Sequence, residues 1–444
     1  MASTKTPDIA PKRLPKEQYV ANFTDLHPPL DAHEALVESD RCYFCYDAPC
    51  MKACPTSIDI PQFIREIQAG HPKSAAKTIF DQNILGGMCA RVCPTETLCE
   101  EACVRETAEG KPVKIGLLQR YATDQAMGDK HPFARAKSSG KKVAVVGAGP
   151  AGLACAHRLS MHGHDVTIFE ARKKSGGLNE YGIAAYKTVD EFAAKEVDFV
   201  LAIGGIKIEH GMALGKKLKL ANLQRDYNAV FLGMGLSGVN ALDLKNEDAD
   251  NIEHAVNYIS DLRQAKDVSK LPVGRNVVVI GGGMTAIDVA IQSKLLGAEN
   301  VTMLYRRGKE HMKASPYEQE LAQTKGVKII YNAMPKKILL KGKKAVGLKC
   351  EYTAVKNKKF EGTGESFEIA ADMIFKAIGQ TLAGQPEEVP ASSSWKFKVD
   401  AEKRTPVKGI WAGGDCAEGG QDLTVSAVDD GRRAAESIHA YLCA

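Results

Sequence analysis

The strongest constraint on this chain is the placement of its cysteines. Eight of the twelve lie in the first quarter of 444 residues, as Cys42-x2-Cys45-x4-Cys50-x3-Cys54-Pro and Cys89-x3-Cys93-Pro-x4-Cys99-x3-Cys103. Thiols gathered in this way indicate metal ligation, because a reducing compartment keeps cysteines from pairing as disulfides. Each cubane cluster takes four ligands, so two iron–sulfur clusters are the natural count. Structural zinc is the alternative, but it typically uses two separate Cys-x2-Cys pairs and this chain has one.

The composition is that of a globular enzyme. It is 44% hydrophobic and 25% charged, and the formal charge of +5 is spread over short lysine runs, which disfavours a nucleic-acid-binding face. The stretch from Met1 to Leu14 is polar and broken by prolines, and no apolar run reaches the roughly 18 residues that span a bilayer. We therefore expect a cytoplasmic protein with no membrane or nucleic-acid partner.

The chain changes character after the cysteine region. Between Thr56 and Gln82 apolar residues recur at helical spacing, so this region is predicted to be helical. After a polar stretch from Gly128 to Gly140, the pattern of strand, glycine turn, helix and strand occurs twice, beginning near Lys141 and near Arg275. Each occurrence predicts a βαβ unit, and two units argue for two bound nucleotides, or for one nucleotide and a decayed copy.

The first βαβ unit carries Gly147-x-Gly149-x-x-Gly152 between an apolar strand and a helix. These glycines permit a tight turn, the approach of a pyrophosphate and close helix packing, while the helix N-terminus faces the phosphates. Glu170 ends the second strand of the unit, where an acid hydrogen-bonds a ribose. The motif predicts a dinucleotide site, and the alternative is a purely structural glycine turn.

The second unit reads Gly281-x-Gly283-x-x-Ala286, again after an apolar strand. Its second strand ends in Arg306 and Arg307 in place of an acid, and Lys313 follows shortly after. A guanidinium pair at this point suits a 2′-phosphate and favours NADPH over NADH. The alternative is a solvated pair of surface arginines.

Two later glycine motifs complete a family pattern. They are GGL at residues 176–178 and GGD at residues 413–415. With the tandem βαβ units, they resemble the flavoproteins with two dinucleotide-binding domains, in which the first site holds FAD and the second NAD(P)H. The resemblance implies a discontinuous Rossmann-like FAD domain into which the NAD(P)H domain is inserted. With the helical, cysteine-rich region before it, we expect an α/β fold that begins with an N-terminal α-helical double [4Fe-4S] domain. The expected segments are 1–137 for the iron–sulfur domain, 138–270 and 379–444 for the FAD domain, and 271–378 for the NAD(P)H domain.

The route of the electrons follows from what the chain lacks. Disulfide reductases of this architecture need a redox-active cysteine pair beside the flavin, whereas Cys155 and Cys416 are single. Hydride carries two electrons and a cluster accepts one, so a flavin is needed between them. We therefore expect electrons to leave the flavin through the cysteine-rich region.

That region resembles a known enzyme family. The stretches DAPCMKACPTSIDIPQFI, MCARVCPTETLCEEAC and IGLLQRYATD are similar to the N-terminal part of dihydropyrimidine dehydrogenase and to its separate small subunit in bacteria. The likeness covers nearly the whole chain. It extends more distantly to the small subunit of glutamate synthase and to the large subunit of the electron-bifurcating transhydrogenase.

The resemblance implies a set of site residues. One cluster would be held by Cys42, Cys45, Cys50 and Cys103, and the other by Cys54, Cys93, Cys99 and Gln119, with Cys89 in place of Gln119 as the competing assignment. FAD contacts are implied at Gly147, Gly149, Pro150, Ala151, Gly152, Glu170, Leu178, Lys187, Gly414, Asp415 and Thr424. NAD(P)H contacts are implied at Gly281, Gly283, Met284, Thr285, Arg306, Arg307, Lys313, Ala377, Ile378 and Gly379. This chain departs from the family pattern beside the flavin, where relatives tend to have Pro and Arg in place of Ala184 and Lys187.

The resemblance also implies a function. The chain would oxidise NAD(P)H at FAD and pass electrons through two [4Fe-4S] clusters to a partner subunit that contains FMN, binds pyrimidines and reduces uracil or thymine to the 5,6-dihydropyrimidine. No FMN barrel is visible in this sequence, so we expect a hetero-oligomer. Two alternatives stay open: the small subunit of glutamate synthase or of a related ferredoxin-coupled NADPH oxidoreductase, and a non-catalytic redox scaffold.

Overall fold

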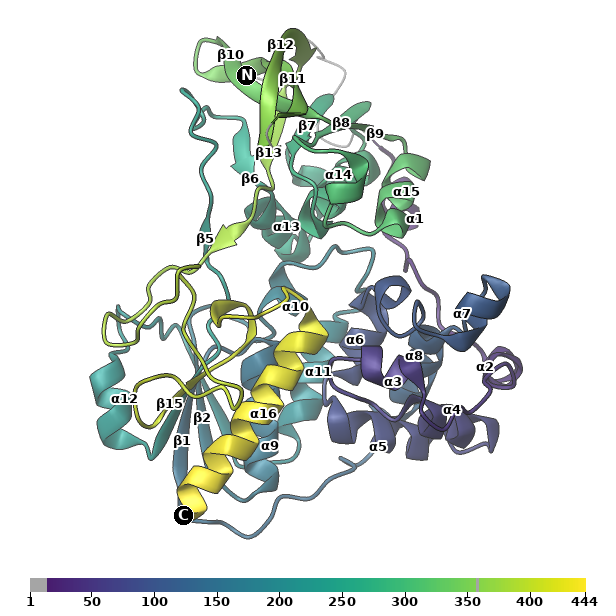
Figure 1. Cartoon of the computed structure of the whole chain (residues 1–444), viewed down its shortest axis with the longest axis vertical. Helices are drawn as coiled ribbons and strands as arrows, with labels where there is room; N and C mark the ends of the chain where they lie inside the picture. Colours follow the sequence, from purple (N-terminus) through teal and green to yellow (C-terminus); the bar gives the residue numbers. More distant parts are fainter. Residues whose placement is uncertain (1–13, 357–358) are drawn as a thin grey trace. The chain divides into compact units, whose positions relative to one another are not determined.

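The computed structural model describes residues 14–356 and 359–444, which form two compact units (Figure 1). The larger unit contains residues 27–180, 190–238 and 381–444. The smaller unit contains residues 181–189, residues 239–380 and the described residues up to Leu26. The short strands β5 (Gly238–Val239) and β14 (Gln380–Thr381) lie where the chain passes between the units. The four predicted domain segments are a finer division than this one and stay a prediction.

Helices make up the first part of the larger unit. They are α2 (Ala32–Ser39), α3 (Pro49–Ala53), α4 (Ile60–Gln68), α5 (Pro72–Gln82), α6 (Gly86–Val92), α7 (Val104–Glu109) and α8 (Ile115–Ala126), with a 3₁₀ turn η1 (Thr95–Thr97). The apolar face of α4, which includes Phe63 and Ile64, is buried in the core. The helical pattern from Thr56 to Gln82 gives two helices, because Gly70 takes a left-handed conformation (φ +79°) and Pro72 then begins α5.

A parallel five-stranded sheet forms the second part of the larger unit. Its order is β15-β4-β1-β2-β3, with β1 (Lys142–Val146), β2 (Asp165–Glu170), β3 (Ile206–His210), β4 (Ala229–Leu232) and β15 (Ile410–Ala412). The helices of this part are α9 (Pro150–Met161), α10 (Leu178–Tyr181), α11 (Phe192–Leu201), α12 (Leu220–Asp226) and α16 (Thr424–Cys443), with the 3₁₀ turn η4 (Gly414–Cys416). Figure 1 shows α16 running alongside α9. Because β15 and α16 come from the end of the chain, this Rossmann-like half is discontinuous, as the family resemblance implies.

The smaller unit contains a second parallel sheet. Its order is β6-β13-β7-β8-β9, with β6 (Ile252–His254), β7 (Asn276–Ile280), β8 (Asn300–Leu304), β9 (Val327–Ile330) and β13 (Met373–Lys376). Its helical elements are α1 (Lys16–Asn22), α13 (Ala255–Gln264), α14 (Met284–Leu295), α15 (Pro316–Thr324), η2 (Val268–Lys270) and η3 (Lys309–His311). An antiparallel sheet of β10 (Ala333–Lys341), β11 (Lys344–Lys356) and β12 (Lys359–Ala370) completes it. Both predicted βαβ units are therefore present, one in each unit.

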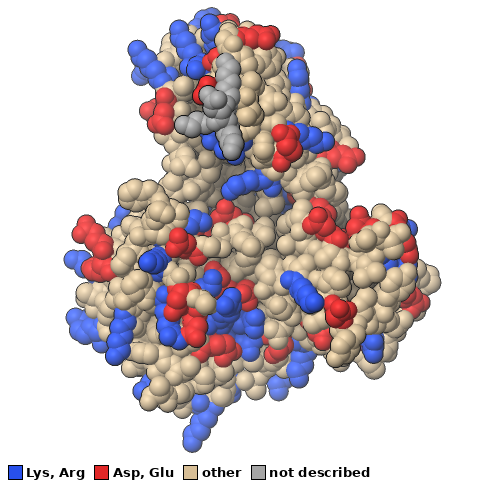
Figure 2. Space-filling view, in the orientation of Figure 1, with Lys and Arg blue, Asp and Glu red and all other residues tan. Residues whose placement is uncertain are grey.

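Two features of the molecule bear on its expected partners. Among the described residues, no helix combines the length and the apolar character needed to cross a membrane. On the face that Figure 2 shows, lysines and arginines are interspersed with acidic side chains. This face therefore carries no continuous basic surface of the kind that binds nucleic acid.

Candidate redox site

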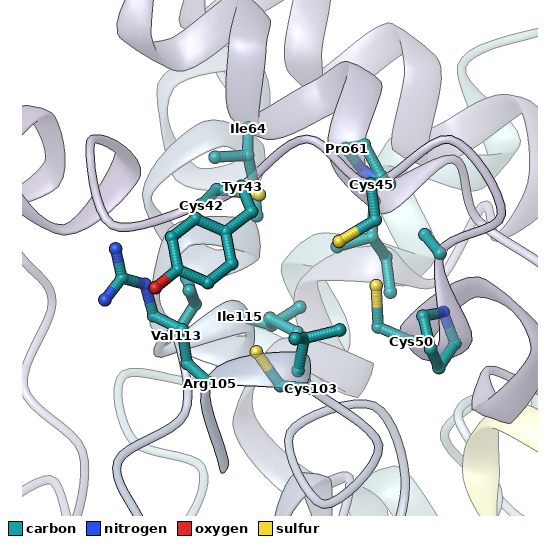
Figure 3. Close-up of a pocket in the computed structure, with 14 residues that line it drawn as sticks. Cys42, Tyr43, Cys45, Cys50, Pro61, Ile64, Cys103, Arg105, Val113 and Ile115 are labelled. Atoms are coloured by element: carbon teal, nitrogen blue, oxygen red, sulfur yellow. The ribbon is translucent and has the colours of Figure 1, made fainter. Parts of the chain in front are cut away.

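Four cysteines line one cavity of the larger unit, which we call the first cysteine cavity. Its thiols come from Cys42, Cys45, Cys50 and Cys103, and its apolar wall includes Ile64. Figure 3 shows the sulfur atoms of Cys45, Cys50 and Cys103 directed into the same space. Three of these cysteines lie on the loop before α3 or within α3, and the fourth precedes α7, so the fold brings together residues that are distant in sequence.

The surroundings of the thiols in this cavity disfavour the negatively charged thiolate form. Burial, together with the neighbouring Cys103 and Cys42, raises the pKa of Cys50 to about 12, and burial also raises the pKa of Cys42. Several thiolates can be charged together in such a place only if a cation offsets their repulsion. The residues present therefore fit a cationic metal centre with thiolate ligands.

A second cavity in the same unit, the second cysteine cavity, is lined by Cys54, Cys89, Cys93, Cys99 and Gln119. A hydrogen bond with Cys89 and burial raise the pKa of Cys93, and burial raises the pKa of Cys99. The two cavities thus separate the cysteines into the two groups that the family resemblance implies, with Cys89 and Gln119 both beside the second group. This donor set also fits an iron–sulfur cluster.

Gln119 is held in one orientation within the second cysteine cavity. Its side chain is 8% exposed, and its Nε2 donates a hydrogen bond of 2.7 Å to the carbonyl oxygen of Gly86. The amide nitrogen is therefore occupied, and the carboxamide oxygen is the atom that can act as a ligand.

One residue is shared by the two cysteine cavities, and another links the second cavity to helix α16. Ile60 lines both cysteine cavities. Val425, in the first turn of α16, lines the second cavity, and Thr424 beside it begins that helix. The second cysteine cavity therefore adjoins the Rossmann-like half of the larger unit, which contains α16, and the first cysteine cavity lies next to the second.

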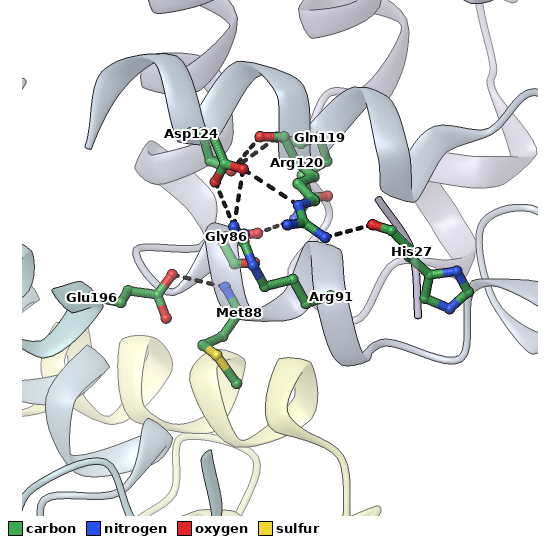
Figure 4. Close-up of polar contacts among 10 residues, drawn as sticks. His27, Gly86, Met88, Arg91, Gln119, Arg120, Asp124 and Glu196 are labelled. Atoms are coloured by element: carbon green, nitrogen blue, oxygen red, sulfur yellow. Dashed lines mark hydrogen bonds and ion pairs between the residues drawn. The ribbon is translucent and has the colours of Figure 1, made fainter. Parts of the chain in front are cut away.

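A buried polar layer joins α6 and α8 to α11 (Figure 4). Arg91 donates two hydrogen bonds to the Asp124 carboxylate, at 2.8 and 2.9 Å, and its guanidinium lies 3.4 Å from the centre of the Phe192 ring. Glu196 Oε1 accepts a hydrogen bond of 2.9 Å from the backbone N–H of Met88, and burial raises the pKa of Glu196 to about 8. The contacts of Met88 and Arg91 with α11 therefore hold the segment that carries Cys89 and Cys93 against the Rossmann-like half of the larger unit.

The predicted FAD motifs converge at the carboxyl ends of the strands of the larger unit. Gly149 is the N-cap of α9, and a Cβ on Gly177 would come 2.7 Å from its Cα. A Cβ on Gly414 would meet the Cβ of Ala151 at 3.1 Å. The glycine loop, the GGL motif and the GGD motif are therefore in contact, which is the arrangement a pyrophosphate needs at a helix N-terminus.

Two predicted acidic residues occupy different environments there. The carboxylate of Glu170 accepts backbone hydrogen bonds of 2.8 Å from Ala148 and from Arg172, so it shapes the glycine loop. Burial and the nearby Asp422 raise the pKa of Asp415 to about 6. Elsewhere in this region the hydroxyl of Thr424 is within 2.9 Å of Asn179 Oδ1, in α10, which begins at Leu178.

Lys187 is placed in the smaller unit. It is 9% exposed, and its Nζ lies 2.8 Å from both Asp288 and Glu318. Burial would lower the pKa of Lys187, but these two carboxylates raise it overall. Tyr186 donates a hydrogen bond of 3.1 Å to Asp288 as well. The ammonium group is therefore paired with two carboxylates of the smaller unit, and its predicted contact with FAD stays a prediction.

The predicted NAD(P)H residues gather at the carboxyl ends of β7, β8 and β13. Gly283 is the N-cap of α14, whose first residues are Met284 and Thr285, and Gly281 packs against Ala377. Asn240 donates a hydrogen bond of 3.1 Å to the carbonyl oxygen of Ile378, next to Gly379. The basic residues of the set are Arg306, Arg307 and Lys313, and none of them forms an ion pair with another described residue. Such charges suit the phosphate groups of a dinucleotide.

Comparison with known proteins matches both parts of this arrangement. The family described as dihydropyrimidine dehydrogenase domain II, 4Fe-4S cluster, matches residues 19–131, and the pyridine nucleotide-disulphide oxidoreductase family matches residues 141–431. FprA of Mycobacterium tuberculosis in complex with NADPH has a TM-score of 0.59 at 16% identity, over 68% of this chain and 85% of its own. Lactococcus lactis thioredoxin reductase has a TM-score of 0.55 at 21% identity, over 68% of this chain and 99% of its own. These structures show the shared fold, and together with the family matches they define the class as NAD(P)H-dependent flavin and iron–sulfur oxidoreductases.

Relatives of full length narrow the class to a family. The NAD-dependent dihydropyrimidine dehydrogenase subunit PreT of Salmonella typhimurium is 35% identical, over 97% of this chain and 98% of its own length. The glutamate synthase [NADPH] small chain of Escherichia coli is 32% identical, over 98% of this chain and 97% of its own. The chain belongs to the family of PreT-type subunits of dihydropyrimidine dehydrogenase, which is related to the small chain of glutamate synthase. Its cofactors are FAD, NAD(P)H and [4Fe-4S] iron–sulfur clusters, as the sequence predicts.

Sequence reasoning missed the polar layer around Arg91, Asp124 and Glu196. The available signal was Glu196 itself, a charged residue within FAAKEVDFV, where the apolar spacing predicts a buried helix face. Its partners lie on α6 and are too distant in sequence to be identified from the pattern.

Proposed function

We propose that this chain is the electron-input subunit of a dihydropyrimidine dehydrogenase. It oxidises NAD(P)H at FAD and delivers electrons, through two clusters, to a partner subunit that contains FMN and reduces uracil or thymine. The observation that supports this proposal is a continuous series of neighbouring sites. It runs from Thr424 and Val425, at the start of α16, through the second cysteine cavity, and Ile60 then joins that cavity to the first cysteine cavity. Such a path suits single electrons leaving a flavin, which is the chemistry that FAD supplies when bound.

The ligands of each cluster follow from the two cavities. We assign Cys42, Cys45, Cys50 and Cys103 to the first, and Cys54, Cys93, Cys99 and Gln119 to the second. Gln119 is preferred to Cys89 because Gly86 fixes its amide nitrogen and leaves its oxygen available. In a Gln119→Ala variant we expect iron to fall from about eight to about four atoms per chain, with no change in Cys89→Ser. The opposite pair of results would make Cys89 the ligand.

The first cysteine cavity is the proposed exit. Tyr43 lines it and is 54% exposed, and Tyr46, between Cys45 and Cys50, is fully exposed. Electrons leaving this cavity therefore reach the surface over a short distance, where the partner subunit binds. Because thiolate ligands need a reducing environment, we place the complex in the cytoplasm.

The test is a reconstitution of the two-subunit enzyme. The purified chain is mixed with an FMN-containing, pyrimidine-binding subunit, and NAD(P)H oxidation is followed with and without uracil. We expect oxidation that depends on both uracil and the partner, and that is lost in a Cys103→Ser variant which still reduces its flavin with NAD(P)H. Oxidation that is indifferent to uracil and thymine would contradict the proposal.

A second function is favoured by one specific observation, the 32% identity with the glutamate synthase small chain over nearly the whole length. The matching assay uses a large glutamate synthase subunit with glutamine and 2-oxoglutarate. Activity there, and none with uracil, would assign the chain to glutamate synthesis. A flavin that NAD(P)H does not reduce would instead identify a redox scaffold.

A further inference from the structure

One buried side chain of the second cysteine cavity has an amide nitrogen that the described residues leave without a partner. Asn83 lines this cavity and is fully buried. Its Nδ2 forms no hydrogen bond with any described residue. A buried N–H donor without a partner is costly and rare in folded proteins. Such a group therefore indicates an acceptor that the polypeptide itself does not supply.

The backbone fixes the orientation of the Asn83 amide. Asn83 is the C-cap of α5, and its Oδ1 accepts a hydrogen bond of 3.1 Å from the N–H of Leu85. Its own backbone N–H donates to the carbonyl oxygen of Ile79 at 2.8 Å. Exchanging the amide oxygen and nitrogen would set an NH₂ group against the Leu85 N–H, where two donors would face each other. The atom without a partner is therefore the nitrogen, which can only donate.

Asn83 and Gln119 bring complementary groups to the second cysteine cavity. Gln119 donates through its nitrogen to Gly86, which leaves its oxygen available (Figure 4). Asn83 accepts through its oxygen from Leu85, which leaves its nitrogen available. Both hydrogen bonds are made with the backbone at the start of α6. One amide can thus offer a ligand oxygen, and the other an N–H donor.

The lining of the cavity indicates which acceptor this donor meets. It combines buried apolar side chains, such as Ile58, with the thiols of Cys54, Cys93 and Cys99. A cluster held by such thiols has sulfide and thiolate sulfur atoms that carry negative charge. Charged acceptors form stronger hydrogen bonds than neutral ones, and the apolar wall keeps water from competing for the donor.

We propose that the side-chain amide of Asn83 donates a hydrogen bond to a sulfur atom of the second cluster and thereby raises the reduction potential of that cluster. Reduction adds one negative charge to the cluster, so an N–H donor stabilises the reduced form more than the oxidised form. A higher potential favours the entry of electrons into the cluster whose cavity adjoins α16. This inference rests on the part of the proposed function that places a cluster in the second cysteine cavity, and it holds with either Gln119 or Cys89 as the fourth ligand.

The experiment is an anaerobic redox titration of the iron-loaded chain, followed by electron paramagnetic resonance. The variant is Asn83→Leu, which keeps the approximate size of the side chain and removes the donor. We expect one of the two cluster potentials to fall by about 59 mV, which is a tenfold change in a one-electron equilibrium constant. Ser39→Ala is the matched control, because it removes a buried hydroxyl that bonds to Leu36 and lies outside the lining of both cysteine cavities. It should leave both potentials unchanged.

A second readout uses the unaltered chain and decides the question even if Asn83→Leu loses iron. When the asparagine side-chain amides carry ¹⁵N, pulsed electron paramagnetic resonance of the reduced protein should detect a ¹⁵N nucleus coupled to a cluster. Among the described asparagines, Asn83 alone lines a cysteine cavity.

Two kinds of failure are distinguishable. In protein with about eight irons per chain, an absent ¹⁵N coupling, or potentials that Asn83→Leu leaves unchanged, would overturn this inference and leave the proposed function intact. An unaltered chain that binds no iron–sulfur cluster would overturn both.

Discussion

Replacing Glu196 with Gln removes an ionisable group from the buried polar layer that joins α6 and α8 to α11, and it keeps the size of the side chain. The side chain is 1% exposed, its Oε1 accepts from Met88, and its Oε2 has no hydrogen-bond partner among the described residues. Burial therefore raises its pKa to about 8, from an ordinary value of 4.5. Since one pKa unit corresponds to about 1.36 kcal/mol, the ceiling for the cost of ionising this group is about 5 kcal/mol.

The sign of the pH dependence follows from this rise. Between about pH 4.5 and pH 8 the folded chain keeps a proton on Glu196 that the unfolded chain has lost. The stability that this group contributes to folding is therefore fully present below about pH 4.5. Between about pH 4.5 and pH 8 it falls by about 1.4 kcal/mol per pH unit as pH rises. From pH 6 to pH 7.5 the loss is about 2 kcal/mol, which is several degrees in the unfolding midpoint of a unit this size. The neutral amide of the Glu196→Gln variant has no proton to lose over this range.

The assay is thermal unfolding of the anaerobic holoenzyme at pH 6 and pH 7.5, for the unaltered chain and the Glu196→Gln variant. We expect the midpoint of the unaltered chain to fall several degrees further than that of the variant. Glu209→Gln, at an exposed position of β3, is the matched control and should follow the unaltered chain. Parallel changes in the unaltered chain and the Glu196 variant would refute the reasoning.

Three further predictions concern the cofactor sites. Gly152→Ala would place a methyl group against the carbonyl oxygen of Gly147 and should yield protein without FAD, read by flavin absorbance, whereas Gly128→Ala, with open space around it, should keep FAD. Cys103→Ser should leave about four irons per chain instead of about eight, by elemental analysis, and retention of all of them would exclude Cys103 as a ligand. Arg306→Ala should raise KM for NADPH about tenfold, the loss of one charged hydrogen bond, and leave KM for NADH unchanged; equal effects on both would show that Arg306 contacts no 2′-phosphate.

The sequence was most informative where local spacing controls local geometry. The glycine loops at Gly147 and Gly281 each follow an apolar strand and begin a helix, and both are found in that context. The division of the cysteines between two sites was harder to predict. Cys103 follows Cys89, Cys93 and Cys99 in the sequence, but it lines the first cysteine cavity together with Cys42. Spacing alone left that division open, and the family resemblance supplied it.

The sequence was least informative where a side chain finds its partner across the fold. Glu170 was predicted to bind a ribose, which stays a prediction, and the structure shows that its carboxylate accepts a hydrogen bond from Ala148 in the glycine loop. Lys187 was predicted beside the flavin, and the structure pairs it with Asp288 and Glu318 in the smaller unit. Such pairs depend on tertiary contacts between distant segments, which leave no periodic signal in the sequence.

The central claim is that electrons from NAD(P)H reach iron held by the N-terminal cysteines. Anaerobic addition of NAD(P)H to the purified chain, followed by freezing and electron paramagnetic resonance, measures this directly. The account predicts reduced iron–sulfur signals in protein that contains about eight irons per chain. A flavin that is reduced without any such signal, or a chain that carries zinc or fewer than about six irons, would contradict it.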